Sequence, residues 1–295
     1  MDKITREIKI CNKLVDLSYN NFSLENYKEI LTKNKYNYDF IESDENLPIK
    51  LMSGNHPNSG ILSSGEGKII IVGKGVLFDS GGLDLKPPDG TMSAMTDDKC
   101  GMLIAMTIAK MFPNQVRAFC PVSTNFIFNS KIIPGNVYNI GKHQVKVTDT
   151  DAEGRLLLIE AISQLNASPD DIIISVATLT GSCSHAIGDK ATAIMSDNED
   201  LLRKYAEASF EAKELAWALP MFDYMQGYYA KEPLRNWIKE FKSSTCQGGM
   251  FIRQFVKYPK NFIHLDIASS AFDSEGMANG VPIKSLINFI RSLKC

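Results

Sequence analysis

The feature of this sequence that most restricts its fold is a set of short apolar runs without polar alternation. KIIIV (68–72) and DIIISVATL (171–179) are rich in β-branched residues, and VRAFCPV (116–122) and FIHLDIA (262–268) are further strand candidates. A strand that is apolar on both faces needs cover on both faces. Segments of helical length separate these runs, at residues 100–112, 153–165, 198–215 and 282–293. The alternation predicts an α/β domain whose sheet is covered by helices on both faces.

The first part of the chain has a different character. Residues 1–66 are polar and rich in Asn and Lys, with one expected helix at 23–33 (SLENYKEILTK) and a turn-rich connector at 55–67. We therefore expect a short N-terminal appendage at 1–66 and a single α/β domain at 67–295.

Charge and cysteine use exclude several classes of protein. Lys and Arg total 32 against 34 Asp and Glu, so a basic surface for nucleic acid is not expected. The charged N-terminus does not resemble a signal peptide, and no run of about 18 apolar residues predicts a membrane span. The six cysteines form no C-x-x-C pair, which is typical of thiols in a reducing compartment. These features predict a cytoplasmic protein that binds neither nucleic acid nor membrane.

Several familiar catalytic motifs are missing from the sequence. The glycines near residues 65–75 precede a strand and match neither G-x-x-x-x-G-K-[ST] nor G-x-G-x-x-G. No G-x-S-x-G is present, and the four histidines lack the H-E-x-x-H spacing of a zinc site. Any candidate active site must therefore be sought among other residue types.

Lysines and carboxylates next to glycines form the strongest candidate site. VGKGVLFDSGGLDLK places Lys74, Asp79 and Lys86 just after the first predicted strand, where α/β proteins commonly bind ligands. A hairpin with surface lysines is the plainer alternative. Two acids, Asp97 and Asp98, precede the helix expected at 100–112 and could also be N-cap residues.

A second acidic group lies in TDTDAEGRLLL (148–158). Asp151 and Glu153 are two residues apart, so in an extended segment they point to the same side, and Arg155 follows them. Each acid alone could be a helix cap. Carboxylates without histidine suit hard or borderline divalent cations, and several of them together suit a two-metal site.

At this point the sequence resembles a known family. The segments VGKGVLFDSGG, LKP, TDTDAEGRL, VATLTG and HLDIA look like the signatures of the M17 leucyl aminopeptidases, also called cytosol aminopeptidases. The resemblance extends from about Val72 to the end of the chain. It implies a zinc-peptidase-like fold with a central, mostly parallel mixed sheet. It also implies a dinuclear metallopeptidase, assembled as a homo-hexamer, that removes N-terminal residues, preferably leucine-like, from short peptides.

The resemblance assigns a role to each matching residue. It implies two divalent ions per subunit, Zn²⁺ and/or Mn²⁺, and a bicarbonate held at Arg155. The implied catalytic pair is Lys86 and Arg155. The implied metal ligands are Lys74, Asp79, Asp98, Asp151 and Glu153. The implied substrate-binding residues are Met95, Thr178, Leu179, Gly181 and Ala268.

These roles are chemically coherent. Two cations would polarise the peptide carbonyl and lower the pKa of a water between them. Lys74 could ligate only as a neutral amine, whereas a charged Lys86 could stabilise the oxyanion that forms on attack. The planar fork of Arg155 suits a planar anion. Binding of the substrate's free amine to a metal would restrict cleavage to the N-terminus.

The sequence also departs from the family pattern. Asp149 replaces the usual Asn, Ser175 replaces an Asp, and the usual N-terminal domain is expected to be absent. The segment between Gly90 and Asp98 is one residue longer than usual, so either Asp97 or Asp98 could be the ligand. We expect Asp98, because the following helix fixes its position, whereas the preceding loop can absorb an insertion.

Two other functions fit parts of the pattern. A non-catalytic relative could keep the metals for a structural or partner-binding role, although it would need neither Lys86 nor Arg155. A Mg²⁺-dependent phosphohydrolase would use the carboxylates, but the lysine ligand Lys74 argues against it.

Overall fold

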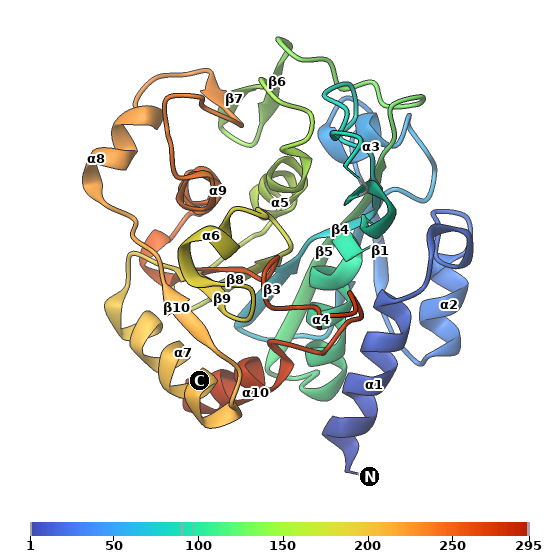
Figure 1. Ribbon diagram of the computed structural model, residues 1–295, viewed down its shortest axis with the longest axis vertical. Coiled ribbons are helices and arrows are strands. Elements are labelled where there is room, and N and C mark those ends of the chain that lie inside the picture. The colour runs from blue at the N-terminus through green and yellow to red at the C-terminus, as the bar shows by residue number, and fades with distance from the viewer. Residues whose placement is uncertain (1, 90, 96, 294–295) are drawn as a thin grey trace.

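The computed structural model describes residues 2–89, 91–95 and 97–293. Nine strands of the described chain form a central mixed sheet (Figure 1). Its order is β1 (Asp39–Glu42), β2 (Gly60–Ser64), β5 (Val116–Asn125), β3 (Ile69–Gly73), β8 (Ile172–Ala177), β12 (Phe262–Asp266), β9 (Thr192–Met195) and β10 (Ala216–Ala218), with β4 (Gly75–Asp79) also paired to β5. Strands β5, β3, β8 and β12 run parallel to one another, while β2 and β9 are antiparallel to their inner neighbours.

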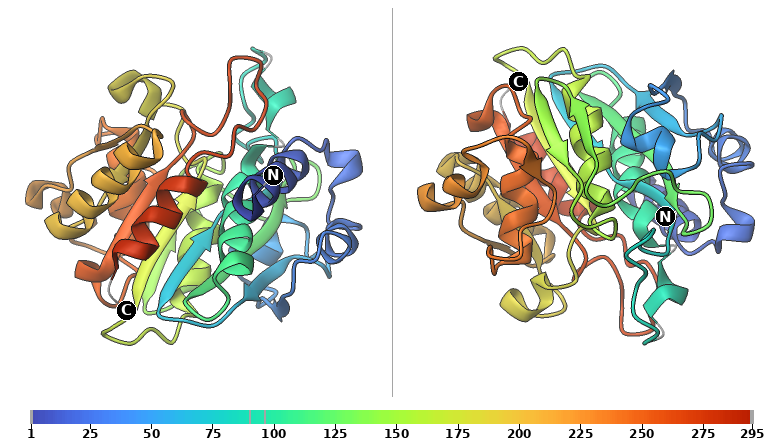
Figure 2. Two further views of the ribbon diagram at one scale, coloured as in Figure 1. Left: turned by 90° about the horizontal axis from the view of Figure 1, so that it is seen from below. Right: turned by 90° about the horizontal axis from the view of Figure 1, so that it is seen from above.

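Helices cover both faces of this sheet, as Figure 2 shows. Alternate residues of β3 explain why two layers are needed: Ile69 and Ile71 belong to one buried core, and Ile70 and Val72 to the other. The first core is covered by α1 (Lys3–Val15), α2 (Tyr27–Lys33), α4 (Cys100–Met111), α7 (Glu199–Ala212) and α10 (Ile283–Ser292). The second is covered by α3 (Pro48–Met52), α5 (Glu153–Ser163) and α9 (Ser244–Arg253). The expected α/β architecture is confirmed.

Smaller elements lie around these layers. A second sheet contains β11 (Leu234–Arg235), β7 (His143–Lys146) and β6 (Val137–Ile140). The short helices α6 (Cys183–Ile187) and α8 (Asp223–Gln226) follow β8 and β10. None of the described helices is both long and apolar enough to cross a membrane.

The first 66 residues contain more regular structure than the sequence indicates. The helix expected at 23–33 begins only at Tyr27, and α1 and α3 are additional. Strand β2 pairs with β5, so β1 and β2 extend the central sheet. Residues 39–42 and 60–64 thus belong to the same sheet as the later strands. The division of the chain at residues 66 and 67 stays a prediction.

The carboxyl ends of the parallel strands meet at one edge of the sheet. In register, Gly73 of β3 lies beside Val176 of β8, and Asp266 of β12 lies beside Ala177. Asp79, the last residue of β4, pairs with Asn125, the last residue of β5. The segments that follow these strands carry most of the predicted site residues.

Candidate metal centre

Lys74 lies at the centre of the candidate site, between β3 and β4. Its side chain is buried, because two neighbouring glycines leave room for it and for the adjacent strand. A Cβ on Gly154 would lie 2.7 Å from Lys74 Cε, and a Cβ on Gly101 would lie 2.2 Å from the Val176 carbonyl oxygen. Side chains at these two positions would displace the lysine or the strand beside it.

The site contains two lysines and four carboxylates, and each lysine forms ion pairs with two of the carboxylates. Lys74 Nζ is 2.6 Å from Asp98 Oδ1 and 2.8 Å from Glu153 Oε1. Lys86 Nζ is 2.7 Å from Asp79 Oδ2 and 2.5 Å from Asp151 Oδ1. The structure therefore brings all five predicted ligands together with Lys86. Burial works against both ammonium groups, but the surrounding carboxylates raise the pKa of Lys74 and of Lys86 above the usual value.

Three of the four carboxyl groups have a raised pKa. Burial is the main cause that raises the pKa of Asp79, Asp98 and Asp151, and the negative charge of Glu153 adds to it. One oxygen each from Asp79, Asp151 and Glu153 can be chosen so that all three lie within 4.8 Å of one another. Three oxygen donors at this spacing, with buried acids around them, fit a hard or borderline divalent cation.

Asn125 orients Asp79, although no sequence motif marks it. Asp79 Oδ1 accepts hydrogen bonds from Gly81 N at 2.8 Å and from Asn125 Nδ2 at 2.7 Å. Asn125 Nδ2 also donates to the Thr150 carbonyl oxygen at 3.0 Å, which links β5 to the segment that carries Asp151. Because Oδ1 is held in this way, Oδ2 is the oxygen that faces Lys86. Asn125 can be identified only from its position opposite Asp79 on the neighbouring strand. That position is known only when the register between β4 and β5 is known.

The predicted substrate-binding residues lie on separate loops at the same edge. Thr178 Oγ1 donates to Asp98 Oδ1 at 2.8 Å, and the Thr178 carbonyl oxygen accepts from Lys74 Nζ at 3.1 Å. Leu179 follows directly. Gly181 and Ala268 both line a cavity of about 660 Å³.

The segment before Asp98 is only partly described. Met95 lies between two 3₁₀ turns, Thr91–Ala94 and Asp97–Lys99, and its amide donates to the Met92 carbonyl oxygen. Gly90, where the longer segment is predicted to begin, and Thr96 lie outside the described residues. Asp98, and not Asp97, contacts Lys74.

Arg155 is buried in the first turn of α5. Its Nη1 donates to the Asn236 carbonyl oxygen at 2.8 Å and to Gln247 Oε1 at 3.4 Å. Its Nε has no hydrogen-bond partner among the described residues. A buried N–H without a partner is costly, so this guanidinium fits a small anion that would accept from it.

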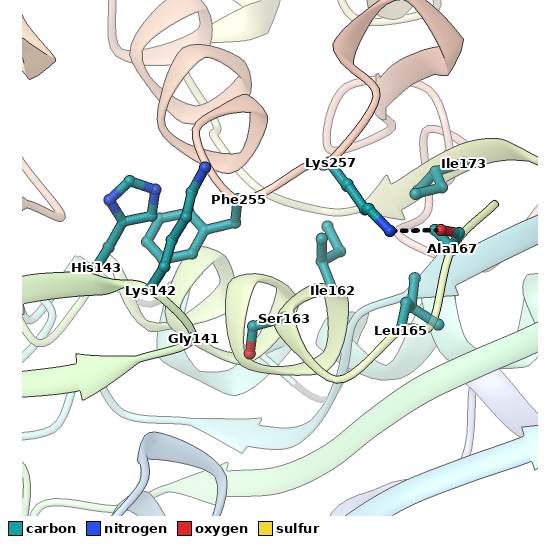
Figure 3. Close-up of a pocket in the computed structure, with 10 residues that line it drawn as sticks. All are labelled: Gly141, Lys142, His143, Ile162, Ser163, Leu165, Ala167, Ile173, Phe255 and Lys257. Atoms are coloured by element: carbon teal, nitrogen blue, oxygen red, sulfur yellow. Dashed lines mark hydrogen bonds between the residues drawn. The ribbon is translucent and has the colours of Figure 1, made fainter. Parts of the chain in front are cut away.

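A second hollow, of about 230 Å³, lies away from these residues (Figure 3). Its lining comes from the β6–β7 hairpin, the end of α5 and the segment after it, β8 and the segment after α9, and includes Lys142, Ile162 and Lys257. Lys257 Nζ donates to the Ala167 carbonyl oxygen at 3.4 Å. No predicted site residue lines this hollow.

Comparison with known proteins decides the family. Residues 50–287 match the cytosol aminopeptidase family, catalytic domain. The chain belongs to this family. The resemblance seen in the sequence motifs is thereby confirmed.

Relatives in this family are similar over most of this chain. A probable cytosol aminopeptidase of Nitrosospira multiformis is 34% identical over 238 residues, which cover 76% of this chain and 45% of that protein. The cytosol aminopeptidase of Buchnera aphidicola is 34% identical over 236 residues, covering 75% of this chain and 46% of that protein. The chain thus spans about half the length of the curated relatives that it matches.

A solved structure shares the fold of this chain. The bottromycin maturation enzyme BotP in complex with Mn has a TM-score of 0.81 at 24% identity, covering 98% of this chain and 70% of that chain. The fold that the two proteins share therefore extends over nearly the whole of this chain.

Proposed function

We propose that this chain is a metal-dependent aminopeptidase that removes N-terminal residues, preferably leucine-like, from short peptides. The observation that supports this most is the arrangement of Lys74, Lys86 and four carboxylates at the carboxyl edge of the sheet. The same residues carry the motifs of the cytosol aminopeptidase family. A purely structural ion site would need neither Lys86 nor the buried Arg155.

We propose that Lys74, Asp79, Asp98, Asp151 and Glu153 would hold two divalent ions, Zn²⁺ and/or Mn²⁺, with Lys74 binding as the neutral amine after it loses its proton to make room for the ion. Such ions, when bound, would polarise the scissile carbonyl and activate water for attack. Thr178 supports the site by donating a hydrogen bond to Asp98. Asn125 supports it by holding one oxygen of Asp79, and supporting bonds of this kind normally matter for metal affinity.

Lys86 and Arg155 would act directly on the reacting groups. Lys86 stays charged because Asp79 and Asp151 lie beside it, so it can donate to the oxygen of the substrate carbonyl as negative charge develops there. Arg155 would hold bicarbonate, or another small planar anion, through its unpartnered Nε. That anion could carry a proton between the attacking water and the leaving amine.

The wider biological setting is also a proposal. We expect a cytoplasmic protein whose partners are short peptides and further copies of itself. A homo-hexamer would give a mass six times that of one chain in light scattering, and an active monomer would contradict it.

Cleavage of defined peptides tests the proposed function. The metal-loaded protein should release leucine from a peptide such as Leu-Gly-Gly and leave the N-acetylated peptide intact, because only the former has a free amine. Mass spectrometry of the products identifies the bond that is cut. Release of phosphate from a phosphoester, with no peptide cleaved, would favour a phosphohydrolase instead.

A further inference from the structure

Asp266 is a buried carboxylate that the proposed mechanism does not use. It is the last residue of β12 and is 0% exposed. Its Oδ1 accepts hydrogen bonds from the backbone amides of Leu179 at 3.1 Å, Thr180 at 3.4 Å and Ala268 at 3.2 Å. Its Oδ2 accepts from Thr180 Oγ1 at 2.6 Å. One side chain thus holds two loops that are nearly ninety positions apart in the sequence.

Those two loops form part of one cavity. Gly181, on the loop after β8, and Ala268, just after β12, both line the cavity of about 660 Å³. The loop after β8 is fixed at its start by Thr178, which contacts Asp98 and Lys74. Asp266 fixes the next two residues of that loop. Beyond them, a Cβ on Gly181 would meet nothing within 4 Å.

A hydroxyl pair connects the Asp266 contacts to helix α9. Thr180 Oγ1 lies 2.8 Å from Thr245 Oγ1 in the first turn of α9. Further along α9, a Cβ on Gly248 would lie only 2.8 Å from Leu179 Cδ2. The side chain of Leu179 is therefore packed against α9 while its amide is held by Asp266.

We propose that Asp266 is a positioning residue that sets the shape of the binding site for the first side chain of the substrate. The proposal rests on the proposed aminopeptidase function. Asp266 touches the loop residues 179, 180 and 268 but none of the five proposed metal ligands. Its loss should weaken substrate binding equally in the ground state and in the transition state. Such uniform binding appears in KM and not in kcat.

The test compares Asp266→Ala with Asp266→Asn. The Ala variant should raise KM for a leucyl peptide by about tenfold or more, with kcat within about threefold of wild type. The Asn variant should stay within about threefold of wild type in both constants. Its carbonyl can still accept from the three amides, and its NH₂ group can donate to Thr180 Oγ1. Metal content should equal that of wild type in both variants.

Thr180→Val provides a second variant, which decides the matter if Asp266→Ala does not fold. Valine has the shape of threonine and removes only the hydroxyl contacts, so KM should rise by about threefold at unchanged metal content. The proposal is overturned if Asp266→Ala lowers kcat at constant KM, loses metal, or behaves like Asp266→Asn. For an unfolded Ala variant, an unchanged KM in Thr180→Val overturns it. A wild-type protein that cleaves no peptide would instead refute the proposed function, and this inference with it.

Discussion

Asp98→Ala should remove one metal ion per chain and nearly all peptidase activity. Asp98 Oδ1 lies 2.6 Å from Lys74 Nζ and accepts a hydrogen bond from Thr178 Oγ1, so it faces the interior of the site. Without this carboxylate, a buried oxygen ligand is lost and no described acid occupies the same place. Metal content measured by mass spectrometry, together with the rate of leucine release, checks the result.

The neighbouring acid provides a matched control. Asp97→Ala makes the same chemical change one position earlier and should keep both metals, with activity changed by less than about tenfold. Asp97 precedes Asp98 in the same 3₁₀ turn, and one of its oxygens is buried without a hydrogen-bond partner among the described residues. If metal is lost only from Asp97→Ala, Asp97 is the ligand. The residue inserted relative to the family pattern would then follow the ligand, and Met95 would no longer match a pocket position.

Lys86→Ala should lower kcat by about 100- to 1000-fold, because that is the typical effect of losing a donor to an oxyanion. The same change at Arg155 should also lower kcat, since its buried guanidinium would no longer hold the proton-carrying anion. Metal content should stay near that of wild type, because neither residue is a proposed ligand. Steady-state kinetics and metal analysis on the same samples measure both quantities.

Lys131→Ala is the control for removal of a positive charge. Lys131 is exposed and lies on the loop between β5 and β6, so kcat should be unchanged. Loss of metal from Lys86→Ala or Arg155→Ala would mean that these residues hold the ions and that their assigned roles are wrong.

The strands that position the site could be predicted because their sequences are short, apolar and rich in β-branched residues. Residues 69–72 are β-branched throughout and residues 172–179 are rich in β-branched side chains, and β3 and β8 are observed at 69–73 and 172–177. Residues that follow such strands share one edge of a parallel sheet. Lys74 and Thr178 directly follow β3 and β8, which pair in parallel, and Lys74 Nζ donates to the Thr178 carbonyl oxygen.

The supporting residues could not be predicted, because they depend on register and not on local sequence. Asn125 matters only because β4 and β5 end side by side, and no spacing along the chain shows this. Asp266 was part of a recognised motif, but its contacts with the loop after β8 arise from the parallel pairing of β12 with β8.

Helix α1 could not be predicted from the sequence for a different reason. Its buried residues, including Cys11, Leu14 and Val15, form one narrow stripe among charged positions. Such a stripe gains stability from packing against α4 and not from its own composition.

Anomalous X-ray scattering from crystals grown with Mn²⁺ would locate the metal ions directly. We expect two anomalous peaks per chain among the carboxylates of Asp79, Asp98, Asp151 and Glu153, with the Lys74 amine beside one of them. Crystals with no peak at this position, in which both lysines keep their ion pairs with the carboxylates, would show that these residues do not form a metal site.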